Sequence, residues 1–139
     1  MKKYELTNES INWKGHKLYR IKAIRNFNDV KAGDLGGFVE NEFNLSHDGN
    51  CWIYNEGKVY GEGEVFNNAK VYDWAEVMSC SRLCDNAEMH DCTEICNFAE
   101  LYGTIKLYDF AKAKHITINS DRVYKNNTEL IDGVGIVYC

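Results

Sequence analysis

The sequence predicts an all-β fold in which short strands coil into a triangular prism of three parallel sheets. Three observations predict it: a six-residue repeat, a turn-forming residue in each repeat, and opposite charges that recur eighteen residues apart. The repeat runs from residue 51 to residue 114 of the 139-residue chain. The coil that it predicts is therefore the central element of the protein.

Each repeat places a mostly small residue two positions before an apolar one. The pattern begins with Cys51 and Ile53 and continues without a slip to Ala111 and Ala113. A six-residue period is too long for alternation along one strand and too regular for one face of a helix. We expect the apolar residue to point inward and the small residue to lie where the chain bends. Such repeats bury little alone, so they must stack on their neighbours.

A residue that favours a turn follows each apolar position by two places. These residues are Asn55, Gly61, Asn67, Asp73, Ser79, Asp85, Asp91, Asn97, Gly103 and Asp109. Glycine tolerates left-handed backbone angles, and the polar side chains bond back to their own main chain. Each repeat therefore predicts a short strand followed by a corner.

The charged residues indicate how many repeats close one turn of the coil. Three repeats per turn stack residues eighteen apart, which pairs Lys58 with Glu76, Glu64 with Arg82, Lys70 with Glu88, Arg82 with Glu100, Glu88 with Lys106, and Glu94 with Lys112. Only Glu76 and Glu94 form a like pair at this spacing. Spacings of twelve or twenty-four residues give mostly like pairs, which destabilise adjacent strands. We therefore expect three parallel sheets and about three to four coils.

The segments on either side of the repeat predict two β caps. Residues 1–46 contain a hairpin from Ile11 to Phe27, with its turn at residues 13–16, and then a glycine-rich loop. The glycines of that loop suggest tight turns with positive φ. Residues 47–114 form the coil itself. An open coil end would expose unpaired strand edges, so both ends need a cap.

The tail, residues 115–139, leaves the period but keeps strand-like runs. These runs are residues 116–118, 122–124 and 134–138, with a turn at Asp132 and Gly133. We expect this tail to form the C-terminal cap. Because it is apolar, it is also a possible self-association segment.

These motifs, in this order, resemble a known group of proteins. Val59-Tyr-Gly-Glu-Gly63 and Val71-Tyr-Asp-Trp-Ala75 resemble the hexapeptide-repeat left-handed parallel β-helix superfamily. The cap motif Gly33-Asp-Leu-Gly-Gly-Phe-Val39 is similar to that of phage and bacterial members, some of which are labelled acyltransferases. The resemblance covers roughly residues 15–115 and implies a left-handed coil, whereas general crossover rules favour a right-handed one.

Composition limits the functional class. Lys and Arg number 16 against 21 Asp and Glu, and the net charge of −5 argues against direct nucleic-acid binding through phosphate contacts. No apolar run reaches membrane-spanning length, and no signal peptide is visible. The six cysteines then indicate a reduced, cytoplasmic protein of a bacterial host.

An aromatic stripe is the clearest candidate binding surface. The position after each inward residue stacks Tyr54, Tyr72, His90 and Tyr108 on one face, with Trp74 and Phe110 at the adjoining corner. Exposed aromatic patches mark interfaces, although aromatic ladders also stabilise stacked strands on their own account. Acidic residues that could imitate phosphates toward a basic partner are Glu62, Glu64, Glu76, Glu94 and Glu100.

A cysteine and histidine cluster resembles a metal site only in the linear sequence. Its members are Cys80, Cys84, His90, Cys92 and Cys96. The predicted coil spreads them over three faces and two corners, whereas zinc needs converging ligands. We expect no metal and no cofactor.

Three functions follow from these observations. We expect a non-enzymatic interaction protein of phage or mobile-element origin that binds and inhibits a host protein, for instance a CRISPR nuclease. The first alternative, from the resemblance, is an acyltransferase that uses acyl-CoA, with His90 as its weak candidate for the catalytic base. The second is a structural module that assembles with itself as a dimer or trimer.

Overall fold

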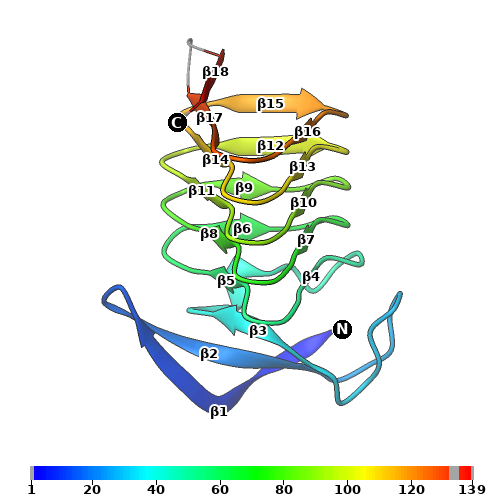
Figure 1. Ribbon diagram of the computed structural model, residues 1–139. Helices are drawn as coiled ribbons and strands as arrows, with labels where there is room; N and C mark the ends of the chain where they lie inside the picture. The colour runs from blue at the N-terminus through cyan, green and yellow to red at the C-terminus, as the bar shows by residue number, and fades with distance from the viewer. Residues whose placement is uncertain (1, 132–134, 139) are drawn as a thin grey trace.

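The computed structural model describes residues 2–131 and 135–138, and it shows a stack of short strands with a hairpin at one end (Figure 1). The N-terminal elements are β1 (Tyr4–Trp13), β2 (His16–Ala23), β3 (Leu35–Val39) and the 3-10 helix η1 (Glu42–Asn44). The strands of the stack are β4 (Trp52–Ile53), β5 (Lys58–Val59), β6 (Glu64–Val65), β7 (Lys70–Val71), β8 (Glu76–Val77), β9 (Arg82–Leu83), β10 (Glu88–Met89), β11 (Glu94–Cys96), β12 (Glu100–Gly103), β13 (Lys106–Leu107), β14 (Lys112–Lys114), β15 (Thr117–Ser120), β16 (Val123–Tyr124) and β17 (Thr128–Ile131), followed by β18 (Gly135–Tyr138).

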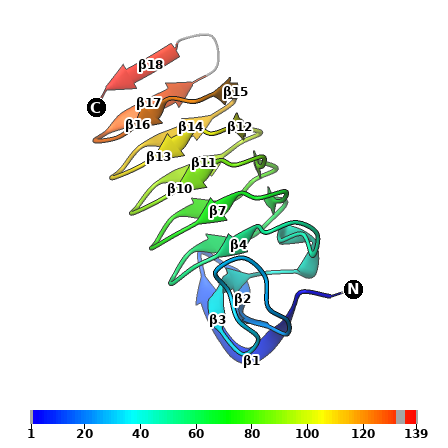
Figure 2. The ribbon, with the colours of Figure 1, turned by 90° about the vertical axis from the view of Figure 1, so that its right-hand side faces the viewer.

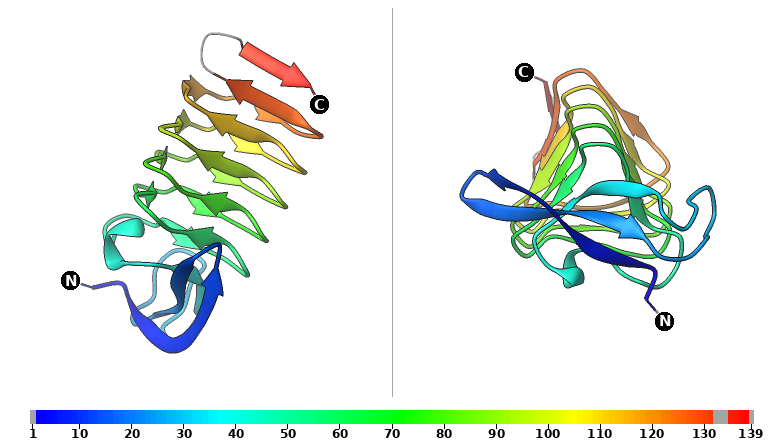
Figure 3. Two further views of the ribbon diagram at one scale, coloured as in Figure 1. Left: turned by 90° about the vertical axis from the view of Figure 1, so that its left-hand side faces the viewer. Right: turned by 90° about the horizontal axis from the view of Figure 1, so that it is seen from below.

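Three sheets surround one core, as the repeat predicts. Their strand orders are β16-β13-β10-β7-β4, β15-β12-β9-β6 and β1-β2-β3-β5-β8-β11-β14-β17-β18. Seen along its axis, the coil has the triangular outline of a prism (Figure 3). The strand pairs within the stack from β3 to β17 are parallel, so the chain is an all-β parallel solenoid. The left-handed winding implied by the resemblance stays a prediction.

The register of the sheets confirms the stacking of residues eighteen apart. Lys58 pairs with Glu76, and Glu64 pairs with Arg82. The like pair of Glu76 and Glu94 is also present. The side chains form ion pairs in three of the predicted opposite-charge pairs: Arg82 with Glu64 at 3.2 Å, Lys106 with Glu88 at 3.8 Å, and Lys112 with Glu94 at 3.5 Å.

The solenoid has about five turns, more than the three to four that the repeat predicts, because strands outside the repeat continue it. Thr117 pairs with Glu100 and Val123 pairs with Lys106, a spacing of seventeen residues instead of eighteen. The corner between β14 and β15 is therefore one residue shorter than the others. This moves the tail out of the six-residue period, while its strands still stack in parallel. The division of the chain at residues 46 and 114 into caps and coil stays a prediction.

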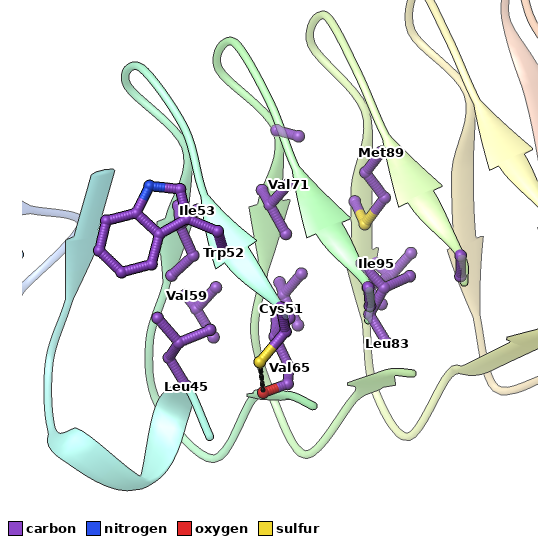
Figure 4. Packing of buried hydrophobic residues seen from close by; sticks show 14 of the residues in the cluster. Leu45, Cys51, Trp52, Ile53, Val59, Val65, Val71, Leu83, Met89 and Ile95 are labelled. Atoms are coloured by element: carbon purple, nitrogen blue, oxygen red, sulfur yellow. Dashed lines mark hydrogen bonds between the residues drawn. The ribbon is translucent and has the colours of Figure 1, made fainter. Parts of the chain in front are cut away.

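Columns of inward apolar side chains fill the prism (Figure 4). One column is Ile53, Val71, Met89 and Leu107, each with no exposed surface. The small residues of the repeat, such as Ala69 and the four alanines that follow at corners, are equally buried. Burial of apolar surface on this scale is the main stabilising contribution, at roughly 25 cal/mol per Å².

The N-terminal segment forms the predicted hairpin, and it begins earlier than predicted, at Tyr4. Its turn contains Lys14 with φ 49° and Gly15 with φ 85°. Strand β3 pairs antiparallel with β2 and parallel with β5, so it joins the hairpin to the solenoid. Figures 1 and 2 show this hairpin lying across the end of the stack.

The glycine-rich loop is partly a strand. Gly33 has the expected positive φ of 97°, but Gly36 and Gly37 belong to β3. There a Cβ on Gly37 would lie 2.3 Å from the carbonyl oxygen of Gly57. These two glycines therefore allow close backbone packing instead of a turn.

At the other end, β18 pairs antiparallel with β17. The predicted turn at Asp132 and Gly133 lies outside the described residues. The described residues include no helix with the length and hydrophobicity needed to cross a membrane.

Candidate functional site

Four stacked rings form a ladder on the five-stranded sheet. Tyr54 stacks on Tyr72 with ring centres 4.4 Å apart, Tyr72 on His90 at 4.4 Å, and His90 on Tyr108 at 4.5 Å. The interplanar angles are 8–12°, so the rings lie nearly parallel. Each ring follows a strand of one sheet by one residue, and the parallel register places the rings above one another. The ladder confirms the predicted stacking of these four residues.

The imidazole ring of His90 is held by a stacked ring on each face and by a carboxylate at one nitrogen. Its ring lies between Tyr72 and Tyr108, and its Nε2 is 2.9 Å from Glu88 Oε1. The His90 side chain keeps 21% of its surface exposed. A carboxylate at Nε2 favours the tautomer that carries its proton there, which leaves Nδ1 as an acceptor. An imidazole oriented by a carboxylate in this way is able to accept a proton at its other nitrogen, which is the chemistry of a general base.

Two lysines flank Glu88 on the same sheet. Lys70 and Lys106 pair in register with it, one coil on either side. Lys106 Nζ lies 3.8 Å from Glu88 Oε2, so both carboxylate oxygens of Glu88 have a partner. The charge of Glu88 is thus balanced while it orients the imidazole.

Two phenols of the ladder, Tyr54 and Tyr72, have a raised pKa. Burial raises the pKa of Tyr54 well above its usual range, and a hydrogen bond from its hydroxyl to Asp29 Oδ1 at 2.7 Å raises it further. Burial also raises the pKa of Tyr72, with the charge of Glu88 as the next cause. Tyr54 and Tyr72 therefore act as neutral aromatic rings.

Trp74 and Phe110 lie at the corner beside this sheet, as predicted. Trp74 is 60% exposed and Phe110 is 57% exposed. Both follow an aspartate with positive φ, Asp73 at 57° and Asp109 at 60°. The corner thus turns these rings outward instead of into the ladder.

The predicted acidic residues do not gather on one surface. Glu64 and Glu100 lie on the four-stranded sheet, Glu76 and Glu94 on the nine-stranded sheet, and Glu62 at a corner. Glu64 pairs with Arg82, Glu94 pairs with Lys112, and Glu100 accepts the hydroxyl of Tyr102. The Glu76 side chain is only 9% exposed and cannot imitate a phosphate, which corrects that expectation.

The cysteines and His90 do not converge. Cys84, His90 and Cys96 lie on three different sheets. In the part of the chain that the structure describes, no group of three metal-ligating side chains is present. Burial raises the pKa of the Cys84 thiol to about 12, so this thiol is a poor nucleophile.

Sequence reasoning missed a second polar cluster beneath the hairpin. The carboxylate of Glu76 accepts hydrogen bonds from Trp13 Nε1 at 2.9 Å and from the Tyr60 hydroxyl at 2.7 Å. Nearby, His16 Nδ1 lies 3.1 Å from both carboxylate oxygens of Glu40. The pairing of the hairpin with the coil is a long-range contact that no local pattern indicates. The sequence offers one signal for this cluster, the like-charged pair of Glu76 and Glu94 on adjacent strands. Two adjacent carboxylates repel each other, so a hydrogen-bond donor from outside the coil could be expected there.

Comparison with known proteins supports the resemblance. No family model matches the chain. The chain is similar to the uncharacterized acetyltransferase YdcK of Escherichia coli (strain K12), with 41% identity over 73 residues. The match covers 47% of this chain and 22% of the relative, so the chain spans about a fifth of the length of the curated relative it matches. With the observed parallel solenoid, this match confirms the resemblance to the hexapeptide-repeat superfamily.

The comparison overturns the main functional prediction. The prediction of a non-enzymatic inhibitor of a host defence protein is wrong, because 73 residues of the chain are 41% identical to a protein named as an acetyltransferase. The physical reason for the error lies in the ladder. Its rings pack face to face on one another, so their aromatic character reflects contacts within the solenoid and did not require a protein partner.

Proposed function

We propose that this chain carries an acyltransferase site of the hexapeptide-repeat type, with acyl-CoA as donor and His90 as general base. The observation that carries the proposal is the 2.9 Å contact of His90 Nε2 with Glu88 Oε1 on the solenoid face. The similarity to an acetyltransferase over about half of the chain supports the reaction class. Glu88 is a positioning residue in this scheme, because it acts through the imidazole.

The chemistry of the proposed step uses the nitrogen opposite Glu88. His90 Nδ1 removes the proton of an acceptor amine or hydroxyl as that group attacks the thioester carbonyl of acyl-CoA. The C–S bond then breaks, and the imidazolium returns its proton to the departing thiolate. The acyl group ends on the acceptor, and free coenzyme A is released.

The described chain supplies one wall of such a site. A hollow of about 220 Å³ lies on the nine-stranded sheet, lined by residues that include Cys96 and Lys114, and it contains no member of the ladder. The exposed edge of His90 instead faces outward from the five-stranded sheet. General-base catalysis works best where water is excluded. The other wall would then come from a second copy of the chain in a dimer or trimer.

The test combines binding and turnover. Acetyl-CoA binding is measured by calorimetry, and thiol release is followed with a panel of amine and hydroxyl acceptors. In the variant His90→Phe a flat ring stays in the ladder but the base is lost. We expect thiol release to fall about 100-fold or more, the usual contribution of a general base. Acetyl-CoA affinity and the free energy of unfolding should change little.

His115→Phe is the matched control, because His115 is exposed and lies outside the ladder. It should release thiol at the wild-type rate. Wild-type turnover by His90→Phe would remove His90 from the mechanism. A wild-type protein that does not bind acetyl-CoA would contradict the acyltransferase proposal and favour the self-assembling module, whose oligomer size can then be measured.

A further inference from the structure

A lysine and a cysteine lie in contact where the hairpin meets the first coil. Lys3, just before β1, and Cys51, just before β4, are both buried with no exposed surface. Lys3 Nζ lies 3.3 Å from Cys51 Sγ, 2.7 Å from Cys51 O and 3.3 Å from Gly49 O. The amine and the thiol are 48 residues apart in the sequence, so the tertiary fold brings them together.

The thiol of Cys51 is not required by the six-residue repeat. Cys51 holds the small-residue position, which is filled by the equally buried Ala69 one coil later. Its sulfur lies 3.4 Å from Ser46 O and 3.8 Å from Val65 O, and Figure 4 shows the second of these contacts. An alanine would satisfy the stacking of the coils equally well. The sulfur therefore adds a chemical group that packing alone does not explain.

Burial favours the uncharged forms of both groups. It lowers the pKa of the Lys3 amine and raises the pKa of the Cys51 thiol. A neutral amine has two N–H bonds, which Gly49 O and Cys51 O can accept. Its lone pair then faces the sulfur, and an amine with a free lone pair is the nucleophilic form of lysine.

A local opening gives an oxidant access to the sulfur. In the described sheet β1 is the first strand and pairs with β2 alone, so its other edge has no strand beside it. Segments held on one side open at a lower free energy than the centre of a fold. When Lys3 moves away, Cys51 regains water and its pKa returns toward the ordinary value. The thiolate that forms is the species that reacts with peroxide.

We propose that Lys3 and Cys51 are a modification site, at which hydrogen peroxide produces a reversible sulfenamide cross-link between Nζ and Sγ. Peroxide first oxidises the thiol to a sulfenic acid by two electrons and is itself reduced to water. After the segment closes, the Lys3 nitrogen attacks the sulfur and the S–O bond breaks. The departing hydroxide takes a proton from that nitrogen and leaves as a second water, so the S–N bond forms without a further oxidant.

The cross-link fastens the hairpin to the first coil until a thiol reverses it. A small thiol attacks the sulfur, the amine leaves with the proton of that thiol, and a second thiol reduces the mixed disulfide. A bond between residues 3 and 51 restricts the unfolded chain, so the cross-linked protein should unfold at a higher urea concentration. The chemistry does not involve His90, so it holds or fails independently of acyl transfer.

The test maps the cross-link by mass spectrometry. Folded protein is treated with hydrogen peroxide and digested without a reductant. The peptides that contain Lys3 and Cys51 should be joined, at about 2 Da below their summed mass because two hydrogen atoms are lost, and dithiothreitol should separate them. The joined peptide should be at least about tenfold more abundant than after oxidation in concentrated urea, because the fold holds the two groups in contact.

Matched variants assign the two partners. Lys3→Met keeps a long buried side chain without the amine, so it should give no joined peptide, and dimedone should capture a sulfenic acid at Cys51. Lys2→Met is the control, because Lys2 is exposed and pairs with Glu42, and it should cross-link like the wild type. Cys51→Ala should fold, since Ala69 fills the equivalent position, and its urea midpoint should not rise after peroxide treatment.

Three results would overturn the assignment. If Cys51 stays reduced while the exposed Cys80 and Cys92 are fully oxidised, peroxide does not reach the site. Sulfinic acid at Cys51 without a joined peptide would show that the amine does not attack. A joined peptide that retains one oxygen atom would contain an N–O–S bridge and would exclude the sulfenamide.

Discussion

Trp13 donates its indole N–H to Glu76 Oε1 at 2.9 Å, which joins the tip of the hairpin to a coil strand 63 residues later. The Tyr60 hydroxyl donates to the same oxygen at 2.7 Å, and Lys14 Nζ lies 3.4 Å from it. Lys58, on the strand paired with that of Glu76, lies over the Trp13 ring at 4.2 Å. The hairpin is thus docked on the solenoid by a nearly buried carboxylate with several donors.

Replacing Trp13 with Phe keeps the aromatic ring and removes this donor. A nearly buried carboxylate that loses one hydrogen bond costs about 1–3 kcal/mol. We expect the free energy of unfolding, measured by urea titration, to fall by that amount. Trp74→Phe is the control, since Trp74 is exposed, and it should change the free energy of unfolding little. An equal loss in both variants would show that the Trp13–Glu76 bond is not the cause.

Glu40 makes the stability depend on pH in the acid range. Burial raises the pKa of this carboxyl, but hydrogen bonds from His16 and from the Gly61 N–H outweigh it and hold the pKa below its usual 4.5. A carboxyl whose pKa is depressed by folding stabilises the folded state above its unfolded pKa, and that contribution is lost as the pH falls through the folded value. Urea midpoints should therefore decrease as the pH drops below about 4.5.

The variant Glu40→Gln isolates this contribution. It should be less stable than the wild type at neutral pH, and its urea midpoint should change less across the acid range. Glu62→Gln, at an exposed corner, should keep the wild-type pH dependence. An unchanged acid slope in Glu40→Gln would assign the loss of stability to other carboxyl groups.

Tyr72 has a ring on each face, so the ladder predicts the effect of its removal. Tyr72→Ala loses two stacked contacts, each contributing about 0.5–1.5 kcal/mol. We expect a decrease of about 1–3 kcal/mol in the free energy of unfolding, with the circular dichroism spectrum unchanged. Tyr72→Phe keeps both contacts and should lose far less. If Tyr72→Ala is as stable as the wild type, the ladder does not stabilise the coil.

Gly37 lies in β3, where the backbone that leads into β5 packs closely against it. Its missing Cβ would fall 2.3 Å from Gly57 O and 2.5 Å from Ile53 Cγ2, and the first of these is a backbone atom. Gly37→Ala should therefore destabilise the protein by about 1–3 kcal/mol, as overpacking does. Gly61→Asn is the contrasting change, because Asn55 and Asn67 occupy the same corner position with φ 56° and 58°. It should be close to neutral in the same thermal or chemical unfolding experiment.

The repeat by itself determined the architecture. Small residues at corners, inward aliphatics and charges eighteen apart each reflect contacts between neighbouring coils, and these recur at a constant sequence spacing. The stacking of Tyr54, Tyr72, His90 and Tyr108 followed from the same spacing, as did the separation of Cys84, His90 and Cys96 onto different sheets.

Only the tertiary structure decided the features that have no fixed spacing. The contact of Glu88 with His90 depends on the rotamers of both side chains, and the bond of Trp13 to Glu76 depends on how the hairpin docks on the coil. The last coil was not predicted because its strands are spaced by seventeen residues instead of eighteen, one residue fewer near His115. Sequence patterns report interactions that repeat or lie close along the chain. Contacts made once between distant segments leave no such pattern, because their free energy depends on how the packed elements meet in three dimensions.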